Sequence, residues 1–116
     1  TGKQIEIEGK NEKLDFTYIE DLAKGCVLAG TKDSGINQIF NITYGKAQTL
    51  YSFVMNLKKM FPNLIFKIKP RDITKPSRGT LSINKAKKLL SFNPKHNLKI
   101  GVKKYVQYLI DNKIYK

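Results

Sequence analysis

Residues 50–69, LYSFVMNLKKMFPNLIFKIK, predict a helix followed closely by a strand, and this pair decides the fold class. The apolar residues recur at the three- and four-residue steps that share one helical face: Leu50, Phe53, Val54, Leu57, Met60 and Phe61. Thr49 can cap this helix, and Pro62 ends it because proline has no N–H to donate. Residues 64–69 then alternate between the two faces of a strand, which Pro70 ends.

Toward the N-terminus, the pattern predicts a short strand and another helix. Residues 4–8, QIEIE, alternate strictly between polar and apolar, which is typical of a half-exposed strand. Six residues then share one apolar helical face: Ile19, Leu22, Ala23, Cys26, Val27 and Gly30. We expect Cys26 to be a small buried hydrophobe in that face. Gly25 is expected to mark the close approach of another backbone, and residues 38–43 predict a further strand, which Gly45 ends.

Toward the C-terminus, a surface loop and two helices are expected. Residues 71–79 are charged and without periodicity, so they predict a loop of the kind that often carries binding residues. Ser82 can cap a short helix, and a last helix follows Asn93-Pro94. The side chains expected to point inward from these helices are Ile83, Ala86, Leu89, Leu90, Leu98, Val102, Tyr105, Val106 and Leu109. The whole pattern predicts one small α+β domain over residues 1–116.

The composition narrows the class of protein. With 41% hydrophobic and 27% charged residues, the chain is typical of a soluble globular protein. No stretch approaches the roughly 18 apolar residues of a membrane span, so we expect no membrane partner. Cys26 is the only cysteine, which excludes an intramolecular disulfide and suits the cytoplasm. Because the chain opens at Thr1 without an initiator Met, we expect it to be an excised or processed piece.

The net charge of +13 does not predict a nucleic-acid partner. Arg71 and Arg78 are the only arginines among the 22 basic residues, whereas proteins that read bases favour arginine for its bidentate fork. The lysines are scattered along the polar sides of the predicted helices. We therefore expect a compositional bias and no nucleic-acid partner.

The usual catalytic constellations are absent from the sequence. No Gly-rich turn has the spacing that cradles a phosphate, and no Tyr has a Lys four positions later. His96 is the only histidine, so a two-His metal site is impossible, and its polar surroundings predict an exposed side chain without a role. Asp15 and Asp21 are better explained as structural carboxylates that accept backbone N–H bonds than as an acid–base pair. We therefore assign no catalytic, cofactor-binding or metal-binding residue.

Three blocks, in order, resemble the C-terminal half of the extended short-chain dehydrogenase/reductase family, which includes UDP-glucose 4-epimerases and nucleotide-sugar dehydratases. Residues 14–23, LDFTYIEDLA, are similar to the family's RDFxYVxDLA. Residues 39–45, IFNITYG, resemble vFNigtG, and residues 78–94, RGTLSINKAKKLLSFNP, resemble RGTLDIsKAkxLLGfxP. Ser91 stands where members usually have the Gly of a left-handed helix cap, which predicts a different cap or some strain.

The resemblance implies a two-part NAD-dependent enzyme that acts on nucleotide sugars. A Rossmann domain outside this chain would bind NAD and oxidise the sugar at C4, and this chain would bind the UDP- or dTDP-sugar. The isolated piece should be inactive and should not bind NAD. Its partners would be the sugar nucleotide and its own Rossmann domain, and the apolar surface left uncovered should favour self-association or a homodimer.

The same resemblance suggests substrate-binding residues. The strand that carries Glu6 and Glu8 is similar to the segment that passes the nucleotide base, although members often have an aromatic residue where Glu8 stands. The family's phosphate-binding Arg is Leu14 in this chain. Arg78, then Arg71, are therefore the candidate diphosphate ligands, as the only guanidinium groups. Two other classes stay open: a non-catalytic binding or assembly module, and a basic nucleic-acid-binding domain.

Overall fold

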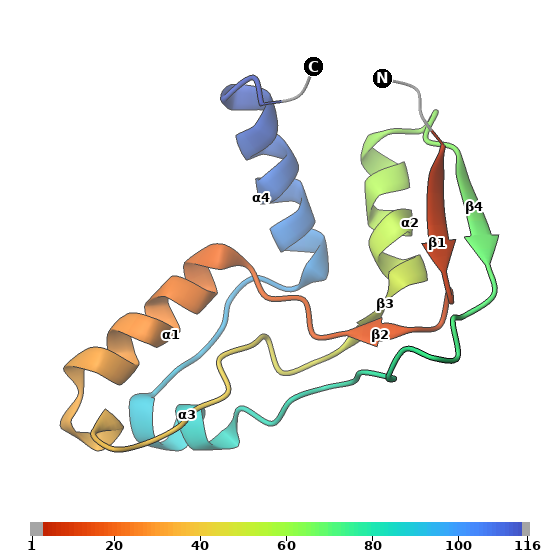
Figure 1. The fold of residues 1–116 in the computed structure, drawn as a ribbon. Helices are drawn as coiled ribbons and strands as arrows, with labels where there is room; N and C mark the ends of the chain where they lie inside the picture. The colour runs from red at the N-terminus through yellow and green to blue at the C-terminus, as the bar shows by residue number, and fades with distance from the viewer. Residues whose placement is uncertain (1–3, 115–116) are drawn as a thin grey trace.

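The computed structural model describes residues 4–114, which form an α+β unit with two small pairs of strands and four α-helices (Figure 1). Strand β1 (Ile5–Glu8) pairs in parallel with β4 (Phe66–Lys69), with Ile5 opposite Phe66. Strand β2 (Lys13–Leu14) pairs antiparallel with β3 (Gln48–Thr49). The predicted α+β class is therefore confirmed.

The helices are α1 (Ile19–Thr31), α2 (Leu50–Met60), α3 (Asn84–Leu90) and α4 (Leu98–Asp111), with a 3-10 turn, η1 (Asp33–Gly35), after α1. Thr49 caps α2 as predicted, because its Oγ1 accepts a hydrogen bond from the Ser52 N–H at 3.0 Å. None of the helices in residues 4–114 is long and apolar enough to cross a membrane.

The buried hydrophobic residues fall into two groups at opposite ends of the molecule (Figure 1). One group packs α3 against α1 and the segment after it, with Ile83, Ala86, Leu90 and Phe92 buried against the half-buried Phe40 and Ile42. The other end brings β1, α2 and α4 together, with Ile7, Val54, Val102 and Val106 buried. The β2–β3 ribbon runs between the two ends (Figure 1).

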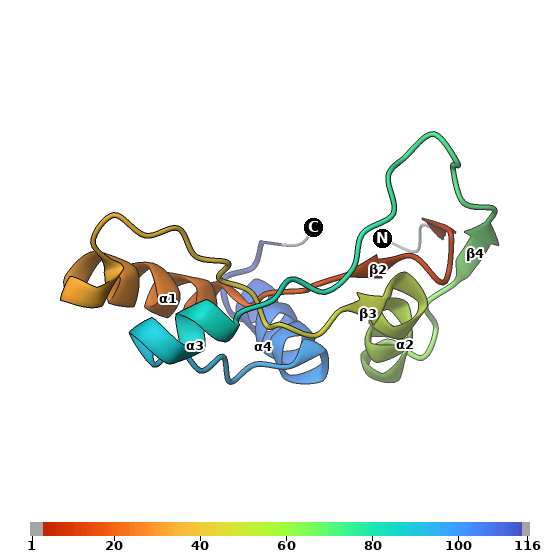
Figure 2. The same cartoon turned by 90° about the horizontal axis from the view of Figure 1, so that it is seen from below.

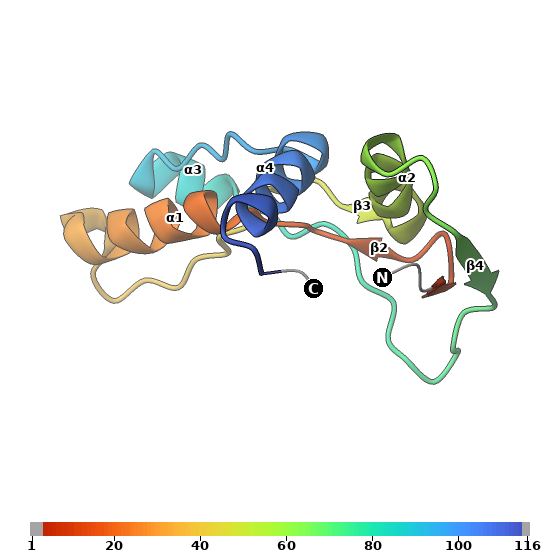
Figure 3. The ribbon, with the colours of Figure 1, turned by 90° about the horizontal axis from the view of Figure 1, so that it is seen from above.

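The molecule is thin and drawn out for its length. Its extents are 49 × 38 × 19 Å and its radius of gyration is 16.7 Å, whereas a compact domain of this size has about 13 Å. Its accessible surface of 8542 Å² exceeds, by roughly 2,000 Å², the surface typical of a folded monomer of this mass. Figures 2 and 3, which are turned by 90° from the view of Figure 1, show the helices spread along one flat layer. The fold therefore leaves surface uncovered that a compact domain would bury.

Part of this surface is the predicted apolar face of α1, which is exposed. Ile19 and Val27 are 65% and 61% exposed, and Leu22 is 37% exposed. Cys26 is exposed as well, so the prediction of a buried thiol was wrong. The described chain buries the opposite side of α1, where Gly25 and the carboxylate of Asp21 lie. Helical periodicity identified an apolar stripe correctly, but residues 4–114 leave most of it exposed.

The predicted strand at residues 38–43 is extended chain without a strand partner among the described residues. Its side chains nevertheless alternate: Phe40 and Ile42 pack on the α3 core, while Ile39 is 88% exposed. The alternation typical of a strand is present, but residues 4–114 provide no neighbouring strand with which this segment pairs. The prediction of a strand was therefore wrong for this chain taken alone.

Three smaller predictions also fail. Ser82 does not cap α3, whose N-cap is Ile83, without a side-chain hydrogen bond. Tyr105 on α4 is 57% exposed, because α4 buries only Val102 and Val106 fully. The close approach at Gly25 comes from side chains: a Cβ there would overlap Ile42 and lie 3.2 Å from the Phe92 ring.

Candidate functional site

The four predicted substrate-binding residues, Glu6, Glu8, Arg71 and Arg78, all line one cavity of about 770 Å³. We call it the loop cavity, because β1 forms one side and residues 71–78 form another, with Leu50, Phe53 and Val54 of α2 contributing apolar wall. These residues lie up to 72 positions apart in the chain, and the parallel pairing of β1 with β4 brings their segments together. Whether they bind substrate stays a prediction.

A glycine allows the two sides of the loop cavity to meet. Gly9 follows β1 with a φ of +70°, a left-handed conformation that favours glycine. Its N–H donates to the Lys69 carbonyl at 3.0 Å, and a Cβ at this position would lie 3.1 Å from the Arg71 Cβ. The end of β1 and the start of the loop are therefore in direct contact.

Arg71 ties the loop to the turn after β1. Its Nε lies 2.7 Å from Glu12 Oε1, an ion pair without hydrogen-bond geometry, and its Nη2 donates to the Lys75 carbonyl at 2.7 Å. The side chains of Arg71 and Glu12 are only 34% and 27% exposed. Much of the Arg71 guanidinium is thus occupied by the protein itself.

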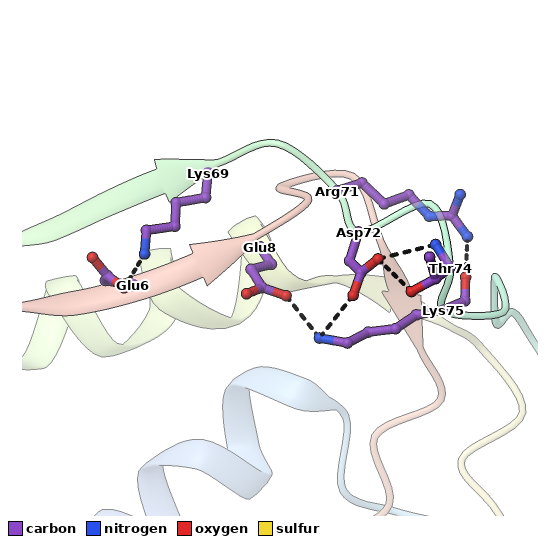
Figure 4. Close-up of polar contacts among 7 residues, drawn as sticks. All are labelled: Glu6, Glu8, Lys69, Arg71, Asp72, Thr74 and Lys75. Atoms are coloured by element: carbon purple, nitrogen blue, oxygen red, sulfur yellow. Dashed lines mark hydrogen bonds and ion pairs between the residues drawn. The ribbon is translucent and has the colours of Figure 1, made fainter.

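Lys75 reaches back from the loop toward Glu8 on β1 (Figure 4), and both residues line the loop cavity. Its Nζ lies 2.8 Å from Glu8 Oε2 and 3.7 Å from Asp72 Oδ2. The hydrogen bond to Glu8, with the charge of that carboxylate, raises the pKa of Lys75, so this amine is fully protonated at neutral pH. Asp72 accepts from the Thr74 hydroxyl and N–H, and these bonds lower the pKa of Asp72. Sequence analysis did not propose Lys75 as a substrate-binding residue, because a loop lysine carries no distinguishing pattern.

The remaining two predicted residues differ in their surroundings. Glu6 pairs with Lys69 on the neighbouring strand, and this hydrogen bond lowers the pKa of Glu6. Arg78 forms no ion pair or hydrogen bond within residues 4–114. Among the four predicted residues, Arg78 therefore has the guanidinium that is most available to a ligand.

A second cavity, of about 660 Å³, lies between α2, α4 and the start of α1, and we call it the helix groove. Five aromatic residues line it: Phe16, Tyr18, Phe53, Tyr105 and Tyr108. Phe16 and Phe53 are stacked with centroids 5.2 Å apart, and the His96 ring tilts against Tyr18 at 4.8 Å.

His96 is not the exposed residue that its polar neighbours predicted, since its side chain is only 16% exposed. Its Nδ1 lies 3.1 Å from Asp21 Oδ1, without hydrogen-bond geometry, and its Nε2 lies 3.2 Å from Lys104 Nζ. Tertiary packing on Tyr18 buries the ring, and no local pattern encodes that contact.

Asp15 and Asp21 are structural, as predicted. Asp15 accepts hydrogen bonds from the Gly45 N–H, the Leu81 N–H and the Thr43 hydroxyl, at 3.0 to 3.2 Å. Asp21 accepts from the N–H groups of Lys95 and His96. Each carboxylate therefore joins segments distant in sequence, and neither faces the other as an acid–base pair would.

The comparisons with known proteins place this fold among nucleotide-sugar epimerases. No protein-family model matches the chain. An uncharacterized protein of Methanocaldococcus jannaschii, MJ1055, is 31% identical over 97% of this chain but only 35% of its own length. The chain thus spans about a third of this relative.

Solved structures match over the same extent. Epimerase Mth375 of Methanothermobacter thermautotrophicus superposes with a TM-score of 0.89 at 22% identity, over 97% of this chain and 34% of its own. UDP-glucuronic acid 4-epimerase of Bacillus cereus, in complex with UDP-glucuronic acid and NAD, gives 0.84 at 23%, over 98% and 37%. UDP-glucose 4-epimerase of Thermotoga maritima, with UDP-glucose, gives 0.82 at 28%, over 97% and 36%. The chain therefore has the fold of about one third of such an epimerase.

Proposed function

We propose that residues 1–116 form the substrate-binding part of an NAD-dependent nucleotide-sugar epimerase or dehydratase. The observation that carries this proposal is the loop cavity: a chain with the fold of one third of an epimerase brings Glu6, Glu8, Arg71 and Arg78 to one cavity. The Thermotoga maritima structure, at 28% identity, contains UDP-glucose, which supports a sugar nucleotide as the ligand class.

In this proposal the loop cavity receives the nucleotide diphosphate. Arg78 is the first phosphate ligand, because a guanidinium fork matches two phosphate oxygens and this one is free of protein partners within residues 4–114. Arg71 holds the loop that carries Arg78 in place, through its contacts with Glu12 and the Lys75 carbonyl. The strand that carries Glu6 and Glu8 forms the wall along which the nucleoside lies.

The uncovered surface is proposed to meet a Rossmann domain supplied by polypeptide outside this chain. The exposed face of α1 is apolar, and residues 38–43 offer an extended edge whose side chains already alternate. An edge of this kind pairs readily with another strand. The roughly 2,000 Å² of excess surface is of the size that specific protein interfaces bury. Self-association through the same face is the alternative.

NAD itself does not fit the described residues. A dinucleotide site needs a glycine-rich turn from a strand into a helix N-terminus. Helix α2 follows β3 directly, so no glycine-rich turn lies between them. The first turn of α1 carries Glu20 and Asp21, whose negative charges repel a pyrophosphate. We therefore assign no NAD-binding residue here. NAD, bound elsewhere in the enzyme, would accept and return the hydride of the sugar.

Binding and turnover measurements test the proposal. Isothermal titration calorimetry of the complete gene product with UDP and dTDP should show binding that weakens with salt, and Arg78→Met should weaken it about tenfold or more. With NAD present, the complete protein, including its Rossmann domain, should convert UDP-glucose. Residues 1–116 alone should neither convert UDP-glucose nor bind NAD. Turnover by the 116 residues alone, or no nucleotide binding by the complete protein, would refute the proposal.

A further inference from the structure

The loop cavity is unusually rich in carboxylates for such a basic chain. Four of the nine acidic residues line it, namely Glu6, Glu8, Glu12 and Asp72, in a chain of net charge +13. Four cations line it too: Lys13, Arg71, Lys75 and Arg78. The formal charges of the cavity wall therefore cancel, and its cations are already partly neutralised by the protein.

Two ion pairs connect the β1 side of the cavity to the loop, and they differ in how easily a ligand could replace one of the partners. The Arg71–Glu12 pair is two-thirds buried or more, and Arg71 also bonds the Lys75 carbonyl, so this pair anchors the loop. The Lys75–Glu8 pair is open to solvent, with side chains 65% and 51% exposed. Exposed ion pairs of this kind contribute little to stability and are readily replaced.

Lys75 can therefore change partners while the loop stays in place. Its carbonyl accepts a hydrogen bond from Arg71, whereas its flexible side chain contacts, among residues 4–114, only Glu8 and, more distantly, Asp72. Lys75 and Arg78 line the same cavity, and the Arg78 guanidinium has no hydrogen bond or ion pair within residues 4–114. A ligand with two phosphates offers more negative charge to Lys75 than the single carboxylate of Glu8 does.

We propose that Lys75 is a phosphate-binding residue of the loop cavity and that Glu8 is its internal competitor. Lys75 leaves Glu8 for the diphosphate that Arg78 also contacts, so that a ligand must displace a carboxylate in order to bind. A diphosphate meets this condition better than a monophosphate. This inference rests on the proposed function, and it gives Glu8 a competing role in place of a direct contact with the base.

A double-mutant cycle tests the inference on the complete gene product. UDP and inorganic pyrophosphate are titrated by calorimetry into the wild type, Glu8→Gln, Lys75→Met and the double variant. Glu8→Gln should tighten both ligands about two- to fivefold, because the competing carboxylate is removed. Lys75→Met should weaken them about tenfold. In the Lys75→Met background, Glu8→Gln should change affinity by less than about twofold.

Glu20→Gln is the matched control. It makes the same change of charge and removes a similarly exposed ion pair, with Lys104 at 2.7 Å, outside the loop cavity. It should leave UDP affinity within about twofold of the wild type. The inference is overturned if Glu8→Gln weakens binding, matches the control, or still tightens binding without Lys75. In those cases the proposed function still holds if the wild type binds UDP. If the wild type does not bind UDP at all, the proposed function and the inference about Lys75 are both refuted.

Discussion

The carboxylate of Asp21 holds the main chain at His96: Asp21 Oδ2 accepts the His96 N–H at 2.8 Å, and both oxygens accept the Lys95 N–H at 3.0 and 3.1 Å. Asp21 lies in the first turn of α1 and is 5% exposed, while His96 precedes α4. One side chain thus fixes where the last helix begins relative to the first. The helix groove depends on that placement, because residues from both sides of the contact line it.

Replacing this carboxylate should destabilise the fold strongly. Asp21→Ala leaves two N–H groups without their acceptor in a buried place, so we expect a loss of about 2–4 kcal/mol in the free energy of unfolding. Urea denaturation followed by circular dichroism measures it. Asp33→Ala, at an exposed position, is the control and should cost less than about 0.5 kcal/mol. Equal losses in the two variants would contradict the structural role of Asp21.

The same carboxylate should make stability depend on acid. Burial alone would raise the pKa of Asp21, but hydrogen bonds from the Lys95 and His96 N–H groups and the contact with the His96 ring outweigh it and lower the pKa. The folded pKa then lies below the unfolded value of about 3.9. The stabilisation is complete above the unfolded pKa and is lost as the pH falls through the folded one.

Urea denaturation at about pH 6 and about pH 3 measures this dependence. The drop in unfolding free energy between the two should be smaller in Asp21→Ala than in the wild type. Glu6 and Asp72, whose pKa values are also lowered, remain in both proteins and supply the common background. An identical drop in both proteins would show that Asp21 does not titrate as described.

Two glycines of α1 should respond in opposite directions to the same substitution. Gly25→Ala places a methyl group against Ile42 and the Phe92 ring, so we expect a loss of about 1–3 kcal/mol from overpacking. Gly30→Ala meets nothing within 4 Å and should stabilise the helix by up to about 1 kcal/mol. Thermal unfolding of the two variants makes the comparison. Tolerance of Gly25→Ala would mean that α1 and residues 38–43 are packed less closely than described.

The left-handed cap of α3 should be improved by glycine. Ser91 has a φ of 56°, a left-handed conformation that glycine adopts without strain, and the Phe92 N–H donates to the Ala86 carbonyl. Ser91→Gly should therefore stabilise the chain by about 1 kcal/mol. Ser52→Gly, inside α2, should instead destabilise it by about the same amount. A loss of stability in Ser91→Gly would contradict the assigned backbone conformation.

The exposed apolar face should matter for association and not for folding. Val27→Ser and Ile39→Ser lie at positions 61% and 88% exposed, so each should change the unfolding free energy by less than about 0.5 kcal/mol. Light scattering should show weaker self-association of residues 1–116, and co-purification should show weaker binding to the Rossmann domain. The control is Leu90→Ala, at a fully buried position, which should cost about 2–5 kcal/mol. Undiminished association in Val27→Ser and Ile39→Ser would place the interface elsewhere.

Several features of this protein follow from the sequence alone, because they depend on neighbours a few residues away. The cap at Thr49, the helices α1, α2 and α4, and the alternation in β1 are all local patterns, and the structure confirms each. The two arginines and two glutamates that line the loop cavity could be named from the sequence as candidates: the arginines as the only guanidinium groups, and the glutamates from the resemblance of their strand. The blocks around Asp15 and Arg78 also identified the kind of fold that the solved structures share.

Only the tertiary structure decided which of these residues form ion pairs, which are buried and which stay exposed to solvent. A periodic apolar stripe shows that α1 has a face to bury, but what buries it depends on segments distant in the chain or outside it. Likewise, the charge of Arg71 is evident in the sequence, whereas its engagement with Glu12 depends on the parallel pairing of β1 and β4. The chemistry of a side chain is evident from the sequence, whereas its burial and its ion-pair partners depend on contacts between remote segments. The ion pair of Lys75 with Glu8 therefore emerged only from the structure.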